Sequence, residues 1–467
     1  MTTRKTSIQY GADRLTLPPL NVAQVLRPRR LKKPPPSQNL LADALHNPIG
    51  TPRLRELAAP SDRVSILLSD PARKFCKAQM LDAVLDELHA AGVPDRNIGL
   101  IIACGMHQPT VEKRIGVPPE LLERYSFQWH DCQDRDKLSL IGLTPEKPDW
   151  TAYLRYLRSI ARVQLADPLA GIAALIRELR ERDEEALRFR RVFSLPARLG
   201  VVLGASLRTP VQINRAARES DLLVCLGQVK PHYFAGFGGG AKSVLPGISS
   251  RLTIGANHAM KTHPRAMLGM IEGNVARQDM EDAARLYRGK LFILNVCQDA
   301  AGRTLAAASG DVVQAHRQLV PWLRRVGQVK VERRTPIVIA GQGMPAGMSL
   351  YQMTKTVAPA AKCVQPGGCL IIAGPCPEGL GDSAQKCEAI FRIGLIKYMP
   401  DNVKIMLVSE MRDHRLLRNL FCDPCDSMER ALDLALARCG HDAEVTVLPN
   451  AGPLIPVAPE EDEADLR

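Results

Sequence analysis

A short segment in the middle of the chain combines residue types that bind anions. Four of the five positions between residues 236 and 240 are glycine, and Lys242 follows shortly after. Glycine lets backbone N–H groups approach a ligand without an obstructing Cβ, and the lysine adds a positive charge. We therefore predict a phosphate-binding cradle formed by Gly236, Gly238, Gly239, Gly240 and Lys242.

The same segment partly matches the P-loop pattern G-x-x-x-x-G-K-[ST] when it is read from Gly236 to Ser243. Two features disagree with that pattern. Ala241 stands where the second glycine belongs, and Pro246 with Gly247 would break the helix that must follow a P-loop. A P-loop-like nucleotide-binding hydrolase is therefore the alternative interpretation, not the preferred one.

Three histidines lie in polar, glycine-flanked stretches just after strand-like runs or turns: His107, His232 and His258. Ligand sites in open α/β sheets lie at the carboxyl ends of the strands, so these positions favour roles in binding or proton transfer. We interpret the remaining histidines that we considered as surface or structural residues, namely His46, His89, His316, His414 and His441.

Asp70 and Arg73 also follow a strand-like run, at residues 63–68. A guanidinium group can bind a carboxylate or phosphate through two hydrogen bonds, which makes Arg73 a candidate for substrate binding. A helix cap for Asp70 and a surface charge for Arg73 are the alternatives.

The elements that must position these residues alternate between strands and helices. Residues 63–68, 79–91 and 98–103 form a predicted β-α-β unit, and the pattern favours a doubly wound α/β fold with mainly parallel sheets. Further strands are predicted at residues 199–203, 222–226, 291–296, 336–340, 369–373, 403–408 and 444–448.

We expect two α/β domains, over residues 1–331 and 332–467. Residues 150–193 contain two helix-period segments without a strand and are predicted to form a helical insertion in the first domain. The acidic tail from residue 459 is expected to be frayed.

Composition limits the class of protein. The chain has 467 residues, 45% of them apolar, and a net charge of +13 from 62 Lys and Arg against 49 Asp and Glu. We found no apolar run long enough for a membrane span and no signal-peptide pattern, so a cytoplasmic protein is expected. The basic block at residues 27–33 lacks aromatic residues, and only 4% of the chain is aromatic, which disfavours nucleic-acid binding.

The 12 cysteines are scattered in a long chain, so most are expected to be reduced, buried thiols. Cys422 and Cys425 form a single C-x-x-C, and a zinc or iron–sulfur site needs about four converging ligands. We therefore interpret this pair as incidental.

Taken in order, these motifs resemble those of the nickel-dependent lactate racemase family. The resemblance rests on Ser69-Asp70-x-x-Arg73, Gly105-x-His107, the segment from His232 through Lys242 to Gly247, Asn257-His258, and Tyr351-Gln352-x-x-Lys355. The spacings agree as well, with Lys242 ten residues after His232 and His258 sixteen residues after Lys242. The resemblance covers most of the chain outside the insertion and the tail.

That resemblance implies a nickel-pincer nucleotide cofactor, a pyridinium mononucleotide whose sulfur-bearing arms and ring carbon hold nickel. Lys242 would be its covalent attachment point, His258 the protein ligand to nickel, and Asp70 a cofactor contact. The glycines from Gly236 to Gly240 would make room for the nucleotide.

The resemblance further implies a racemase or epimerase of a small 2-hydroxy acid that works by transient hydride transfer. His107 and His232 would be the acid–base pair. Arg73, Gln352 and Lys355 would bind the substrate carboxylate, in a cleft between the two domains. Cofactor-maturation enzymes are the implied partners, and oligomerisation is compatible with the pattern.

Three positions differ from the family pattern: Gln108, Gly238 and Ala72 stand where arginine, serine and threonine are common. Loss of an arginine beside a catalytic histidine changes the charge near the substrate, so other hydroxy acids or sugar acids fit as well as lactate. A non-catalytic relative would be expected to lose Lys242 or His258, and both are present.

Overall fold

The computed structural model describes residues 6–31, 39–69, 75–107, 117–145, 208–379, 397–411 and 422–461. Several predictions lie outside these ranges: the site residues Asp70 and Arg73, the strand at 199–203, the insertion at 150–193, and the end of the acidic tail.

The first sheet contains the predicted β-α-β unit. β4 (Val64–Ser69) and β5 (Ile98–Ala103) are parallel, and α3 (Lys77–Ala90) connects them. Their apolar residues face two different hydrophobic cores in alternation, which explains why both strands are mostly apolar. The strand order is β13-β12-β9-β4-β5-β6, with β13 antiparallel. The other strands are β6 (Ser126–Trp129), β9 (Leu222–Val229), β12 (Lys290–Gln298) and β13 (Thr304–Gly310).

The second sheet is built around β15 (Thr335–Gly343), which pairs in parallel with three strands. All four strands predicted after residue 332 are present in it, and the predicted α/β class with mainly parallel sheets is confirmed. Besides β15 these are β16 (Val364–Ala373), β17 (Lys404–Val408) and β19 (Val445–Leu448), and β18 (Cys422–Cys425) forms the edge beside β17.

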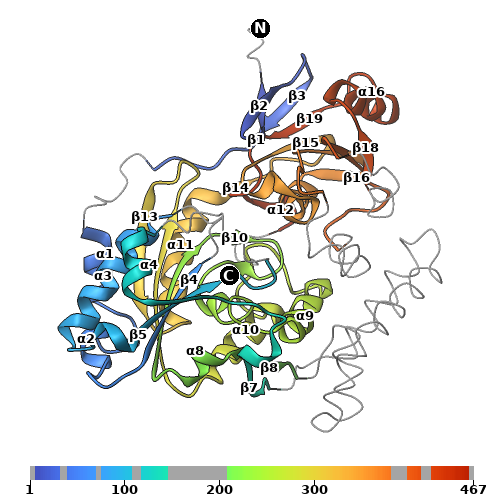
Figure 1. The fold of residues 1–467 in the computed structure, drawn as a ribbon. Coiled ribbons are helices and arrows are strands. Elements are labelled where there is room, and N and C mark those ends of the chain that lie inside the picture. Colours follow the sequence, from blue (N-terminus) through green and yellow to red (C-terminus); the bar gives the residue numbers. More distant parts are fainter. Residues whose placement is uncertain are drawn as a thin grey trace.

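The N-terminal strands belong to this second sheet. β1 (Ser7–Gly11) pairs with β15 and β3 (Val22–Val25) pairs with β19, while β2 (Asp13–Thr16) forms a hairpin with β1. Figure 1 shows these blue strands among the orange and red ones. The first residues of the chain therefore lie apart from the rest of the expected 1–331 unit, because strand pairing is set by tertiary contacts and not by order in the chain.

Helices surround both sheets (Figure 1). Five of the described helices begin at a Ser or Asn whose side chain accepts a backbone N–H, which satisfies part of the first turn. These are α8 (Arg215–Glu219), α9 (Arg251–Ala259), α10 (Val275–Arg285), α12 (Leu350–Ala361) and α16 (Met428–Cys439). Helices without such a cap are α1 (Leu40–His46), α2 (Leu54–Leu57), α4 (Pro119–Arg124) and α11 (Gln314–Gly327).

Three short antiparallel or parallel pairs complete the described structure. They are β7 (Leu138–Leu143) with β8 (Pro210–Asn214), β10 (Pro231–His232) with β11 (Gly236–Phe237), and β14 (Gln328–Lys330) with β20 (Ile455–Val457).

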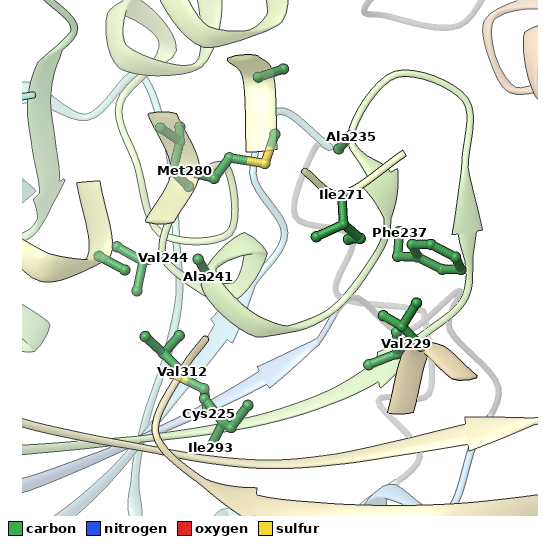
Figure 2. Packing of buried hydrophobic residues seen from close by; sticks show 14 of the residues in the cluster. Cys225, Val229, Ala235, Phe237, Ala241, Val244, Ile271, Met280, Ile293 and Val312 are labelled. Atoms are coloured by element: carbon green, nitrogen blue, oxygen red, sulfur yellow. The ribbon is translucent and has the colours of Figure 1, made fainter. Parts of the chain in front are cut away.

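One hydrophobic core lies beneath the glycine-rich segment. Phe237, Ala241 and Val244 pack there with Val229 and Ile293 of the first sheet, as Figure 2 shows. The same core contains residues from late in the chain, among them Tyr398, Ile455 and Val457. The two parts of the molecule therefore share buried surface.

Glu87 joins α2 to α3, and its ionisation should affect stability. The carboxylate accepts hydrogen bonds from Arg53 at 3.1 Å and from Arg55 at 2.6 Å. Burial alone would raise the pKa of Glu87, but the hydrogen bonds from the two arginines outweigh it and hold the pKa below its usual value. We expect Glu87→Gln to lower the free energy of unfolding at pH 7 by about 1 kcal/mol, since water screens part of the interaction.

Because the pKa of Glu87 is lowered in the folded state, this contribution is present above the unfolded-state pKa and is lost as the pH falls through the folded-state pKa. Urea denaturation should therefore show the difference between the wild type and Glu87→Gln shrinking below about pH 4. A difference that stays constant with pH would contradict this account.

Candidate active site

A pocket of about 180 Å³ opens at the carboxyl ends of β4, β5 and β9. These strands are parallel and adjacent, so their ends meet at one edge of the sheet, where ligand sites were expected. The pocket brings together the following predicted site residues: His107, His232, Gly238, Gly239, Lys242, His258, Gln352 and Lys355.

The backbone after β9 does not have P-loop architecture. The β10–β11 hairpin leads into a single 3-10 turn at Gly240–Ser243, which contains Lys242. The chain then turns through residues 244–248, and α9 begins only at Arg251. A P-loop needs a helix directly after its lysine, so the observed geometry disagrees with the nucleotide-hydrolase alternative.

The glycine loop, residues 235–240, has two faces. Gly238 and Gly239 line the pocket. Three glycines of the loop, Gly236, Gly239 and Gly240, have positive φ and pack against protein. A Cβ would lie 1.9 Å from the Met270 carbonyl oxygen at Gly236, 2.7 Å from Asn295 Oδ1 at Gly239, and 3.0 Å from the His316 ring at Gly240. Close packing and positive φ therefore require glycine at these three positions.

Three of the predicted residues meet around one aromatic ring. Phe234 is 1% exposed, and its ring centroid lies 4.7 Å from that of His232 and 5.0 Å from that of His258. The Nζ atom of Lys242 lies 5.5 Å from the centre of the same ring. The imidazoles and the amine thus share one contact surface, although they come from three different segments of the chain.

His258 is held at the end of α9 by its neighbour Asn257. The Asn257 side chain donates to the Ala276 carbonyl at 3.0 Å and to the buried Asp279 carboxylate at 2.9 Å. The Nδ1 atom of His258 is buried and has no hydrogen-bond partner among the described residues. A buried nitrogen without a partner has a free energy cost unless a ligand binds it.

Burial and positive charge keep two of the histidines neutral. Burial lowers the pKa of His232 well below its usual value, and Lys242 and Lys355 lower it further. Burial likewise lowers the pKa of His258, with Lys242 and Lys261 adding to the effect. A neutral imidazole is the form that can accept a proton or bind a metal.

Another part of the pocket wall comes from α12, beyond residue 331. Tyr351, Gln352 and Lys355 line the pocket from the first two turns of this helix, which Ser349 caps. The Lys355 ammonium donates a hydrogen bond to the Gln352 side-chain oxygen. An ammonium beside an amide gives this wall donors suited to a carboxylate.

Sequence reasoning missed several residues of the site. Phe234 was not singled out, although it lies two residues after His232 in a chain with few aromatic residues. Lys230 and Gln228 also line the pocket, and their position directly at the end of β9 could have identified them.

The cysteine prediction agrees with the described part of the chain. Every cysteine in the described ranges is free, and most are buried. Burial raises the pKa of Cys422 to about 12 and also raises that of Cys425.

Within the described ranges no three His, Cys, Asp or Glu side chains are grouped so that they could hold a metal ion. The described helices include none with the length and apolar character needed to cross a membrane.

Comparisons with known proteins agree with the motifs. The family described as the lactate racemase N-terminal domain matches residues 9–154 and 196–269. The lactate racemase of Thermoanaerobacterium thermosaccharolyticum is 26% identical, over 95% of this chain and 97% of that protein. The lactate racemase of Lactiplantibacillus plantarum is 24% identical, over 88% of this chain and 89% of that protein.

Solved structures support the same assignment. The lactate racemase apoprotein from T. thermosaccharolyticum superimposes with a TM-score of 0.75 at 25% identity, over 97% of this chain and 100% of that one. A Thermotoga maritima protein shares the fold, with a TM-score of 0.54 at 13% identity over 85% of this chain and 96% of that one. The resemblance predicted from the sequence motifs is confirmed: residues 9–154 and 196–269 match the lactate racemase N-terminal domain, and the chain is similar to lactate racemases along almost its whole length.

Proposed function

We propose that this protein is a racemase or epimerase of a small 2-hydroxy acid and that it uses a nickel-pincer nucleotide. The observation that carries the proposal is the convergence of His232, Lys242 and His258 around Phe234 in one pocket. The chain is similar along almost its whole length to proteins named lactate racemase, which supports this class of isomerase.

The described residues fit such a cofactor. His258 has a buried Nδ1 without a partner, and a neutral imidazole suits nickel that also has sulfur ligands. Lys242 offers an amine for covalent attachment, and the backbone of Gly238 and Gly239 lines the same pocket. Asp70 is the further proposed contact. The cofactor, when bound, supplies a hydride acceptor.

His107 and His232 are the proposed acid–base pair, and both line the pocket. The hydrogen on the substrate carbon is too weakly acidic for direct deprotonation near neutral pH, so it leaves as hydride while one histidine takes the hydroxyl proton. The product of this half-reaction is a planar keto acid. When the hydride returns to the opposite face, the new alkoxide takes a proton from the other histidine, which must carry that proton at the start of the cycle. With His232 neutral, His232 takes the hydroxyl proton and a protonated His107 gives one back. Reaction of the opposite enantiomer needs the reverse protonation of the pair.

Lys355 and Gln352 are the proposed binding groups for the substrate carboxylate, together with Arg73. They lie on α12 and line the same pocket as the histidines. We propose that this wall closes on the substrate, because fixing the carboxylate orients the reacting carbon between the two imidazoles. The enzymes that build the cofactor are the proposed partners, and the cytoplasm is the proposed location.

The first test follows the hydrogen on the substrate carbon. The protein should be expressed with cofactor-maturation enzymes and incubated in D₂O with a panel of chiral 2-hydroxy acids. We expect the inverted product to keep protium on carbon, because hydride does not exchange with solvent. NMR or mass spectrometry measures this, and deuterium at that carbon would exclude hydride transfer.

The second test separates cofactor attachment from turnover. Lys242→Ala and Lys242→Arg should both abolish the cofactor adduct in intact mass spectra, since neither offers a lysine amine. His107→Ala should keep the adduct but lower kcat by about 10²- to 10⁴-fold. Equal loss of the adduct in all three variants would refute the separate roles.

The third test concerns the carboxylate-binding wall. Lys355→Met should raise KM by about 10- to 100-fold, which corresponds to the loss of one charge-assisted hydrogen bond. Lys362→Met is the matched control, because Lys362 lies just after the same helix and pairs with Glu461, outside the pocket. If both variants raise KM equally, Lys355 does not bind the carboxylate.

A further inference from the structure

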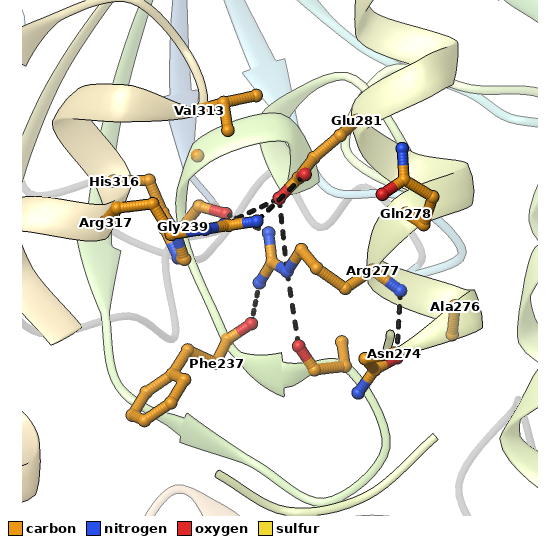
Figure 3. A network of polar contacts seen from close by, with 12 residues as sticks. Phe237, Gly239, Asn274, Ala276, Arg277, Gln278, Glu281, Val313, His316 and Arg317 are labelled. Carbon is orange, nitrogen blue, oxygen red and sulfur yellow. Dashed lines mark hydrogen bonds and ion pairs between the residues drawn. The ribbon is translucent and has the colours of Figure 1, made fainter. Parts of the chain in front are cut away.

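The peptide oxygens of the glycine loop point into the protein, away from the pocket. Arg277 on α10 donates to the carbonyl of Ala235 at 3.2 Å, to that of Gly239 at 3.3 Å, and also to that of Phe237. His316 on α11 bonds to the carbonyl of Gly238 at 2.9 Å. Figure 3 shows the Arg277 guanidinium beside these carbonyls. Arg277 and His316 are 1% and 0% exposed, and neither lines the pocket.

This pair, which we call the loop clamp, is held in turn by a buried ion network. Glu281 accepts two hydrogen bonds from Arg317, at 2.7 and 3.0 Å, and lies 4.0 Å from Arg277. Arg317 also lies 3.2 Å from Nδ1 of His316. The Gly238 carbonyl only accepts, so Nε2 of His316 must carry the hydrogen, and Nδ1 accepts from Arg317. The clamp therefore has a defined charge and tautomer.

A glycine-rich loop needs such a clamp because glycine alone does not select one backbone conformation. Gly236, Gly239 and Gly240 all have positive φ, a region that glycine enters as readily as the ordinary one. Rotation of a peptide plane in this loop would turn a carbonyl oxygen toward the pocket. That oxygen would repel an anionic ligand beside Lys242.

We propose that Arg277 and His316 are positioning residues of the active site, which fix the loop carbonyls away from the pocket so that the wall beside Lys242 accepts an anion. The identity of this anion, the nucleotide cofactor or the hydroxy acid, rests on the function proposed above. The fixed conformation that the loop clamp gives to the glycine loop does not depend on that function.

Two amides report on that order directly. The Gly238 N–H donates to the Lys230 carbonyl at 2.7 Å, and the Gly240 N–H donates to Asn295 Oδ1 at 2.8 Å. Both bonds break if the peptide planes rotate. Hydrogen exchange at these amides therefore measures clamp function without cofactor or substrate.

The test compares matched variants of the full chain by hydrogen–deuterium exchange and by the yield of the Lys242 adduct. His316→Gln keeps a donor near the position of Nε2 and should behave like the wild type. His316→Leu removes that donor and should raise the exchange rate of the two amides about tenfold. Arg277→Lys should raise it about 10- to 100-fold, since this variant loses more hydrogen bonds to the loop. Both disruptive variants should also lower the adduct yield. Glu87→Gln is the control for loss of a buried ion pair away from the pocket.

Unchanged exchange and adduct yield in His316→Leu and Arg277→Lys would overturn the proposal, as would equal effects of His316→Gln and His316→Leu. If Arg277→Lys does not fold, the comparison of His316→Gln with His316→Leu alone tests the proposal. If the wild type forms no adduct but exchange still rises in the disruptive variants, the function proposed above fails while the loop clamp stands.

Discussion

The contact of Phe234 with two imidazoles and one amine is the constraint on which the rest of the site depends. A buried ring excludes water from His232 and His258, and its electron-rich face attracts the ammonium of Lys242. Exclusion of water keeps the imidazoles neutral, and the nearby positive charge reinforces that effect. The Phe234 ring thus brings the two imidazoles and the amine together, and burial with nearby positive charge lowers the pKa of both histidines.

Much of the fold could be predicted because strands buried on both faces read as continuous apolar runs. The prediction for residues 98–103 matches β5 from end to end. β13 was not predicted, since its alanine-rich sequence has low strand propensity and it forms only by pairing with β12. The N-terminal strands were not predicted, and their residues fell within the expected 1–331 unit, because no local pattern shows that Tyr10 pairs with Gln342.

The site could be predicted where chemistry coincides with strand ends or glycine motifs, as at His107, His232 and Lys242. Arg277 could not be predicted as part of the site, because the sequence of α10 has the pattern of a polar, exposed helix. Arg277, Asp279 and Glu281 are nevertheless buried there, each bound to polar groups of other segments. Hydropathy patterns assume that polar side chains face water, and they fail where a polar side chain satisfies backbone groups inside the protein.

The position of β1 and β3 in the second sheet has a consequence for how the chain folds. Tyr10 pairs with Gln342 and Val25 with Val447, so these ladders join segments that are far apart along the chain. Such long-range pairing costs loop entropy before any contact forms, and it is intrinsically slow. Unpaired strand edges invite association with other chains. The second sheet therefore keeps edges open to other chains until β15 and β19 have met β1 and β3.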